Sequence, residues 1–254
     1  MTFVYDGTPI GLANAVAAAL ALDGETDVGA SIAAADAFRP NLFYEARRVQ
    51  TDYPAALAFW RVLAGRLPAD SFTEVFTCFF AGEHGFEDTL LRYLRLLLAT
   101  GGRAAENWTD ETVRRIHKLG GRIGYEIHRL HGFVRFQRLP DGLYYARVTP
   151  DHPILPLLAP HFTARFADQR WLIHDLRRNA GVYYDGAHWH FLPEVAFPTA
   201  PEHALAACDP FEELCQAIWR EYHGTIAISE RTNPRLQKQR MPVRYWGNMT
   251  EMRD

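Results

Sequence analysis

The residues from Arg231 to Trp246 combine cationic and aromatic side chains in a pattern that suits a ligand carrying phosphates and bases. Tyr245 and Trp246 directly follow a cationic run that contains no acidic residue. Cationic side chains bind phosphates, and flat aromatic rings stack on nucleobases. We therefore expect these cations to hold phosphates while Tyr245 and Trp246 stack on a base; the alternative is a solvated basic segment whose rings dock on the core. The cations of the run are Arg231, Arg235, Lys238, Arg240 and Arg244.

Asn233 and Pro234 place most of these cations on a short predicted helix. Asn is a favoured N-cap residue, and Pro is favoured at the first helical position. The sequence therefore predicts a helix that begins directly after Asn233. Pro242 should end this helix, because proline lacks the backbone N–H group that a helix interior needs.

A second polar cluster contains Asp168, His174 and Arg178. Asp168 or His174 could act as a general acid or base, and Arg178 could hold a phosphate. With His128, Asp168 and His174 are the candidate catalytic residues. The alternative is a buried polar network that joins a helix end to a strand. His174 and Asp175 are neighbours, so on a strand they would point to opposite faces and could not act as a pair.

Residues 109–131 are predicted to form a long helix with two distinct faces, starting from Thr109 as its N-cap. Lys118, Arg122 and Arg129 share one face, with Glu126 beside them. This basic stripe could follow a phosphate backbone, or it could be a solvated face on which Arg122 pairs with Glu126. The opposite, core-facing stripe consists of Val113, Ile116, Gly120, Ile123, Ile127 and Leu130.

Three glycines, Gly120, Gly121 and Gly124, lie on the flank between those two faces. Each costs about 1 kcal/mol relative to alanine in a helix interior. Three of them within five residues require a compensation. We expect that either another part of the backbone or a ligand packs closely against them, with His117 and His128 at the border.

A metal site is not expected. His188 and His190 share one face of a predicted strand, but no third ligand follows at a recognisable spacing. The three cysteines, Cys78, Cys208 and Cys215, include no Cys-x-x-Cys pair, which also argues against a disulfide framework. No P-loop, dinucleotide-binding glycine fingerprint, serine nucleophile elbow or His-Glu-x-x-His motif occurs. We expect no bound cofactor.

The basic C-terminal segment resembles the signature of a bacterial family ascribed to DNA metabolism or DNA repair, the domain of unknown function numbered 4130. Similar motifs run along nearly the whole chain. They are Tyr5-Asp6-Gly7, Pro40-Asn41-Leu42-Phe43, Thr51-Asp52, Tyr93-Leu94, Lys118-Leu119, Glu126-x-His128-Arg129, Arg135-Phe136, Tyr144-Tyr145-Ala146, Pro150-Asp151-His152, Leu157 to Phe162, and Asp168-Gln169-x-Trp171-x-Ile173-His174-Asp175.

The resemblance implies a role in DNA repair or modification. Members of this family are encoded beside a radical-SAM protein or fused to a uracil-DNA glycosylase, so the expected partners are DNA or a nucleotide and one of these proteins. The family carries no assigned chemistry. One alternative is a hydrolase or lyase that acts on damaged DNA or a nucleotide; another is a protein-binding adaptor whose basic and aromatic surfaces meet an acidic partner.

Composition is that of an ordinary globular protein. The 254 residues are 48% hydrophobic and 22% charged, with a formal net charge of −3. Residues 114–147 nevertheless hold 8 basic and 2 acidic residues, so a basic patch is possible on a chain that is acidic in total. No apolar run approaches the ~20 residues that span a bilayer. The start of the chain does not resemble a signal peptide, and we expect a cytoplasmic location without membrane contact.

The predicted fold is α+β, with a mainly helical N-terminal half followed by an antiparallel sheet covered by helices. That sheet should contain a hairpin at Pro140-Asp141-Gly142, a strand at 171–175, and a second hairpin at Asp185-Gly186. The chain is expected to be one large domain, 1–254, which Gly101-Gly102 could subdivide into a helical part, 1–102, and an α+β part, 103–254. Further predicted strands are 2–5 and 47–50, further helices are 11–22, 55–67, 70–81, 86–99, 154–166 and 210–222, and 23–36 is a connection that is helical in part.

Overall fold

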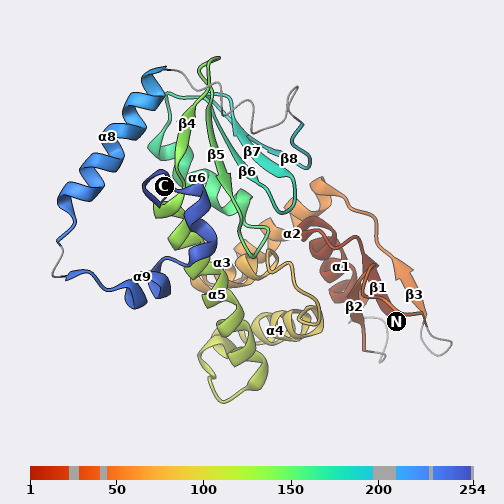
Figure 1. Ribbon diagram of the computed structural model, residues 1–254. Helices are drawn as coiled ribbons and strands as arrows, with labels where there is room; N and C mark the ends of the chain where they lie inside the picture. Colours follow the sequence, from red (N-terminus) through yellow and green to blue (C-terminus); the bar gives the residue numbers. More distant parts are fainter. Residues whose placement is uncertain (23–28, 41–44, 197–209, 229–230, 253–254) are drawn as a thin grey trace. The chain divides into compact units, whose positions relative to one another are not determined.

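A computed structural model describes residues 1–22, 29–40, 45–196, 210–228 and 231–252 (Figure 1). It divides the chain into two compact units, Met1–Tyr125 and Glu126–Asp254. The boundary falls within helix α5 (Glu111–Phe133), and Gly101-Gly102 lies inside the first unit. The organisation as one large domain stays a prediction. The Asn41-Leu42-Phe43 part of one family motif, residues 23–28 of the predicted connection, and Cys208 lie outside the described residues.

The first unit contains a parallel sheet beside its helices: the strands predicted at 2–5 and near 47–50 belong to it, and its third strand was not predicted. Its strands β1 (Thr2–Tyr5), β2 (Ser31–Ala34) and β3 (Ala46–Arg48) lie in the order β2-β1-β3. Thr2 is in register with Ser31 on one side and with Ala46 on the other. Strand β2 was predicted as part of a connection because its sequence, SIAA, is short and rich in alanine, which is depleted in strands. Pairing with β1 overrides this weak local preference.

Capping residues set the ends of several helices in the first unit. Asp52 caps α2, since its side chain accepts a hydrogen bond from the Ala55 N–H group at 3.0 Å. Gly101 ends α4 in the left-handed conformation, with φ of 61°. The N-cap of α5 is Asp110 rather than Thr109, because the Asp110 carboxylate accepts from the N–H group of Thr112 at 2.7 Å. The helices are α1 (Pro9–Leu22), α2 (Tyr53–Arg66), α3 (Ala69–Cys78), α4 (Glu87–Thr100), η1 (Arg103–Glu106) and the first part of α5.

The second unit contains a sheet in the order β4-β5-β6-β7-β8, visible side by side in Figure 1. The sheet is mixed, which corrects the predicted antiparallel one: β5 and β6 pair in parallel, with Tyr144 opposite Trp171. Helix α6 (Leu155–Arg165) lies between them in the chain and supplies the long crossover that a parallel pair needs. Both predicted hairpins are confirmed. The strands are β4 (Phe136–Arg138), β5 (Tyr144–Val148), β6 (Trp171–Asp175), β7 (Ala180–Tyr184) and β8 (Trp189–Leu192).

The two faces of this sheet bury different side chains. Trp171 is fully buried in an aromatic group with Phe162 of α6 and with Phe136, whose ring centroids lie 6.3 and 6.1 Å from its own. Residue 172 alternates to the other face, where Leu172 packs with Tyr145 in a smaller cluster. His174 lies two residues after Leu172 and therefore points to this second face, where Tyr145 is its neighbour.

The remaining elements are α8 (Pro210–Ile226), α9 (Pro234–Arg240), η3 (Val243–Asn248) and η4 (Thr250–Met252). The predicted start of α9 is confirmed, because the Asn233 side chain accepts from the Leu236 N–H group at 3.0 Å. Its predicted end before Pro242 is also confirmed. Helix α8 is joined to strand β4 by a hydrogen bond: the Glu212 carboxylate accepts from the Arg138 N–H group at 3.1 Å. Among the described helices, none has the length and apolar character needed to cross a membrane.

Candidate functional site around Glu126

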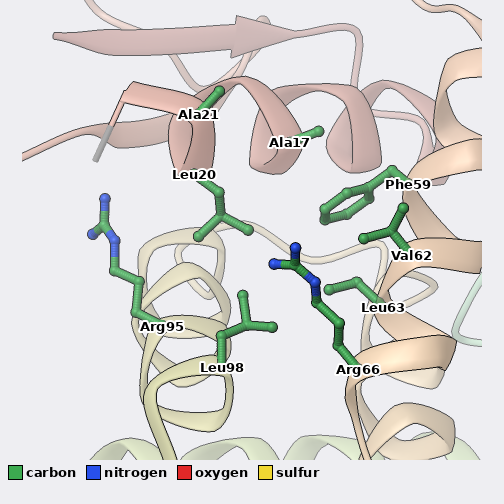
Figure 2. A pocket seen from close by; sticks show the side chains of 9 residues that line it. All are labelled: Ala17, Leu20, Ala21, Phe59, Val62, Leu63, Arg66, Arg95 and Leu98. Atoms are coloured by element: carbon green, nitrogen blue, oxygen red, sulfur yellow. The ribbon is translucent and has the colours of Figure 1, made fainter. Parts of the chain in front are cut away.

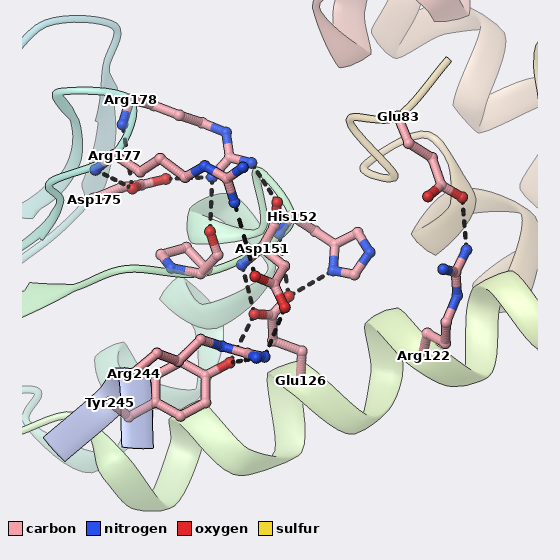
Figure 3. Close-up of polar contacts among 11 residues, drawn as sticks. Glu83, Arg122, Glu126, Asp151, His152, Asp175, Arg177, Arg178, Arg244 and Tyr245 are labelled. Carbon is pink, nitrogen blue, oxygen red and sulfur yellow. Dashed lines mark hydrogen bonds and ion pairs between the residues drawn. The ribbon is translucent and has the colours of Figure 1, made fainter. Parts of the chain in front are cut away.

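The carboxylate of Glu126, on α5, collects four hydrogen bonds from two distant segments of the second unit (Figure 3). It accepts from the backbone N–H groups of Asp151 and His152 at 2.7 and 3.2 Å. It also bonds the Nδ1 atom of His152 at 2.5 Å and the hydroxyl of Tyr245 at 2.9 Å. Only 5% of the Glu126 side chain is exposed. The carboxylate therefore joins α5, the loop after β5 and the segment that follows α9.

Glu126 is held in its ionised form. Burial alone would raise the pKa of this carboxyl, but the hydrogen bonds from His152, the Asp151 N–H group and Tyr245 outweigh burial, and its pKa is lowered. The predicted pair between Arg122 and Glu126 does not form. Arg122 instead donates to Glu83 at 2.6 Å within the first unit.

The Glu126–His152 contact fixes the orientation of the imidazole. Because the Nδ1–H group of a neutral His152 donates to the carboxylate, the lone pair resides on Nε2. Only 13% of the His152 side chain is exposed, and its Nε2 atom bonds nothing in the part of the chain that the structure describes. A histidine held in this way by a carboxylate can accept a proton at Nε2.

Arg244 and Tyr245 lie on the other side of Glu126. The Arg244 guanidinium lies 4.8 Å above the Tyr245 ring, donates to the Tyr245 hydroxyl at 3.1 Å, and pairs with Asp151 at 2.6 Å. Burial and the Glu126 charge raise the pKa of Tyr245 to about 12, so the phenol stays protonated and donates to Glu126. The predicted stacking of Tyr245 on a base does not fit this conformation, because the residue is only 2% exposed.

Arg178 closes the network from the turn after β6. Its guanidinium donates to the Asp175 carboxylate at 2.8 Å and to the carbonyl oxygens of Pro150 and Asp151 at 3.1 and 2.5 Å. Arg177 also reaches the Asp151 carboxylate, at 3.8 Å. Arg178 therefore links the turn after β6 to the loop after β5, and its main contacts are internal rather than directed at a phosphate.

The three predicted catalytic residues lie in separate environments. Asp168 is exposed in the turn before β6 and pairs with no described residue. His174 is buried, accepts from the Tyr145 hydroxyl at its Nδ1 atom at 2.8 Å, and bonds Asn179 through Nε2 at 3.0 Å. Burial lowers its pKa. His128 is exposed on α5. Their joint catalytic role stays a prediction, and it draws no support from these positions.

The cations of α9 are arranged differently from those around Glu126. Arg235 and Lys238 are exposed, as are Arg231 just before the helix and Arg240 at its end, and none of the four pairs with an acidic group in the described part of the chain. Arg129 supports the helix from α5, because its Nη2 atom donates to the Gln239 carbonyl at 2.8 Å. A guanidinium at this end of a helix satisfies a carbonyl oxygen that has no partner within the helix.

The other predicted contacts have mixed outcomes. Trp246 is half-buried, and its Nε1 atom donates to the Met241 carbonyl at 2.9 Å, which holds the ring beside the end of α9. Lys118 is exposed on the part of α5 that belongs to the first unit. Arg178 and Arg244 meet at Asp151, where acidic and carbonyl groups occupy them.

Asp151 and His152 were not predicted as site residues, and Glu126 was expected beside a basic stripe that either follows a phosphate backbone or is a solvated face. The wheel of α5 put Glu126 beside the arginines, but it could not show that a loop from another segment covers it. The signal in the sequence that could have indicated these residues is the Pro150-Asp151-His152 motif, one of the motifs similar to those of the family. Local patterning does not reveal a contact between residues that are 26 positions apart.

Several of the histidines that the structure describes make other contacts. No group of three or more His, Cys, Asp or Glu side chains in the described residues could hold a metal ion. His190 bonds Asp185 at 3.2 Å, and His131 of α5 stacks on His161 of α6 with ring centroids 4.0 Å apart. Burial, helped by the nearby His161 and His128, lowers the pKa of His131 to about 4, so His131 is uncharged at neutral pH.

Residues 84–251 match the family described as a domain of unknown function, DUF4130. This match covers more than half of the chain, and the chain therefore belongs to this family. The whole network around Glu126 and all of α9 lie within the matched residues. No curated protein and no solved structure matches the chain.

Proposed function

We propose that the protein binds nucleic acid, as a factor of DNA repair or modification, through the exposed cations of α9 and of the turn before it. The observation that carries the proposal is one exposed segment with the cations Arg231, Arg235, Lys238 and Arg240, none of which pairs with an acidic group among the described residues. Phosphate contacts dominate the affinity of such surfaces and require no base-specific geometry. The half-buried ring of Trp246, beside the end of the helix, is the remaining aromatic candidate for a base contact.

The network around Glu126 supports this surface. Arg244 and Tyr245 follow α9 directly and are held by Asp151 and Glu126. Arg129 holds the other side of the helix end through the Gln239 carbonyl. In this proposal the buried polar network positions the basic segment, and the arginines within the network do not themselves contact phosphate.

Binding is tested by fluorescence anisotropy with labelled single-stranded, duplex and uracil-containing DNA. The double variant Arg235→Gln/Lys238→Gln should weaken binding about tenfold or more, because each charged hydrogen bond contributes about 1.5–3 kcal/mol. The matched control is Arg165→Gln/Arg220→Gln, which removes two exposed cations elsewhere in the second unit. Equal affinities for the two variants would refute the assignment to α9.

A second candidate function is acid–base catalysis on damaged DNA or a nucleotide, as a hydrolase or lyase. The Glu126–His152 contact favours it, since a carboxylate-held imidazole with its second nitrogen unbonded is suited to take up a proton. His152→Gln keeps an N–H donor for Glu126 but removes the basic nitrogen. Lost turnover with unchanged DNA binding supports catalysis, and the variant of an exposed histidine, His188→Gln, is the control. Absence of turnover by the unmodified protein on all three DNAs rules catalysis out.

The family resemblance suggests that a radical-SAM protein or a uracil-DNA glycosylase is the working partner. In this proposal the protein presents DNA to that partner. Repeating the binding survey with each partner present tests this idea, because a presenting factor should bind DNA more tightly in the ternary complex. An adaptor that instead binds an acidic protein surface would show no DNA affinity alone and no gain with the partner.

A further inference from the structure

The first unit contains a cavity of about 410 Å³ between α1, α2 and α4 (Figure 2). Each helix turns apolar residues toward it at helical spacing: Leu20 from α1, Phe59 and Leu63 from α2, and Leu98 from α4. The small side chains of Ala17 and Ala21 leave room where larger ones would fill the space. A volume in this range is typical of small-molecule pockets.

One guanidinium lies over this apolar cavity. Arg66, in the last turn of α2, extends into the pocket with its guanidinium turned toward α1 (Figure 2). It is exposed and pairs with no described acidic group. Arg95 lines the cavity from α4 but makes an interaction of its own, so the head group of a ligand is assigned to Arg66 alone.

We propose that this cavity binds a free straight-chain carboxylate, with the carboxylate on Arg66 and the alkyl chain between Leu20, Leu63 and Leu98. A planar guanidinium matches a carboxylate through two parallel hydrogen bonds. No described lining residue carries a hydroxyl, amide or carboxylate side chain. A ligand with a polar body, such as a sugar, would therefore lose hydrogen bonds to water without replacing them, whereas an alkyl chain gains from burial.

Two residues, one on α2 and one on α1, allow the pocket to be tested with matched variants. Arg61 belongs to the same helix as Arg66 and is exposed, but it does not line the cavity. It is therefore a matched control for Arg66. Ala17 is only partly buried, so a leucine there should fill the cavity without breaking the helix.

Isothermal titration of the full chain with decanoate, decanol and decyltrimethylammonium tests the proposal. Decanoate should bind, decanol should bind at least tenfold more weakly, and the cation should not bind. Arg66→Met should lower decanoate affinity about tenfold, since it keeps the apolar stem but removes the charged donors. Arg61→Met should leave the affinity unchanged, and Ala17→Leu should abolish binding.

Thermal unfolding of each variant establishes that it is folded, and Arg66→Lys provides a second variant that keeps the charge and should retain part of the affinity. Failure of decanoate to bind the unmodified protein overturns the proposal. Equal binding of decanoate and decanol, or full affinity in Arg66→Met, overturns it as well. The proposed DNA-binding helix α9 belongs to the second unit, whereas the pocket belongs to the first. The proposals of DNA binding and of carboxylate binding can therefore succeed or fail separately.

Discussion

The hydroxyl of Tyr245 donates to the carboxylate of Glu126 at 2.9 Å, although 119 residues separate them in the chain. Both groups are buried, and the remaining hydrogen bonds of Glu126 come from the loop at Asp151 and His152. The contact therefore fastens the basic C-terminal segment to the middle of α5. Removing one donor from a buried, ionised carboxylate destabilises the folded protein, because the acceptor then has neither water nor a protein partner.

Tyr245→Phe should lower the free energy of unfolding by about 1–3 kcal/mol, because it leaves Glu126 one donor short without changing the ring. Urea denaturation measures this difference. Tyr222→Phe is the control, since Tyr222 is 54% exposed in the same unit. Similar stabilities for the two variants would contradict the role assigned to the Tyr245 hydroxyl.

Glu126→Gln should change how stability depends on acid pH. The pKa of Glu126 is lowered in the folded protein, so in the unfolded chain the carboxyl binds a proton at higher pH. Its contribution is complete above the unfolded pKa, about 4.3, and is lost as the pH falls through the folded pKa. The stability difference between the unmodified protein and the variant should therefore shrink below about pH 4.3. A difference that stays constant across that range would show that Glu126 is not preferentially ionised in the fold.

His131→Phe should remove part of the acid sensitivity at milder pH. The pKa of His131 is lowered to about 4, mainly by burial, whereas an unfolded histidine titrates near 6.5. The unfolded chain thus binds more protons between these values, and stability should fall as the pH decreases from about 6.5 to 4. The variant keeps a ring against His161 and should show a smaller fall in melting temperature. His188→Gln, an exposed histidine, should behave like the unmodified protein.

Salt should weaken DNA binding steeply. Each phosphate contact on duplex DNA contributes about −0.9 to the log–log slope of affinity against salt, so four cations predict a slope of roughly −3 to −4. Arg235→Gln/Lys238→Gln should make the slope less steep by roughly two units. A DNA affinity that does not respond to salt would contradict the assignment of phosphate contacts to these four cations.

The glycines of α5 should respond differently to alanine. A Cβ atom added at Gly124 meets nothing within 4 Å, whereas one at Gly120 would lie 3.2 Å from Cγ of Glu74. The Glu74 carboxylate is held by Tyr93 at 2.7 Å and by His117, so it cannot move freely. Gly124→Ala should therefore stabilise the protein by about 1 kcal/mol, and Gly120→Ala by less. If Gly124→Ala stabilises the fold but weakens DNA binding, the open flank of the helix contacts the ligand.

The elements that could be predicted from sequence are those with strong local signals. The helix after Asn233-Pro234 and the hairpins at Pro140-Asp141-Gly142 and Asp185-Gly186 depend on capping and turn chemistry within a few residues, and all three are confirmed. The parallel pairing of β5 with β6 was missed because the direction of a pairing is set by the crossover and by packing, not by the strand sequence. Strand β2 was missed because SIAA has little strand preference without its neighbour β1.

The candidate site was harder to predict, for a related reason. His174 has the chemistry of a catalytic residue, but Tyr145 and Asn179 occupy both of its nitrogens. Glu126 looks like one half of a surface ion pair, but a loop 25 residues away covers it. Residue type indicates what a side chain could do, whereas the partners that decide its role come from other parts of the chain.

The long sequence separation between Glu126 and Tyr245 has a consequence for biosynthesis. Ribosomes add about 5–20 residues per second. Roughly ten seconds therefore pass between the synthesis of Glu126 and that of Tyr245, whose hydroxyl binds its carboxylate. The residues up to Tyr125 contain a core of their own and can condense during this interval. The buried network of the second unit is completed only after Tyr245 has been synthesised, when the first unit can already have folded.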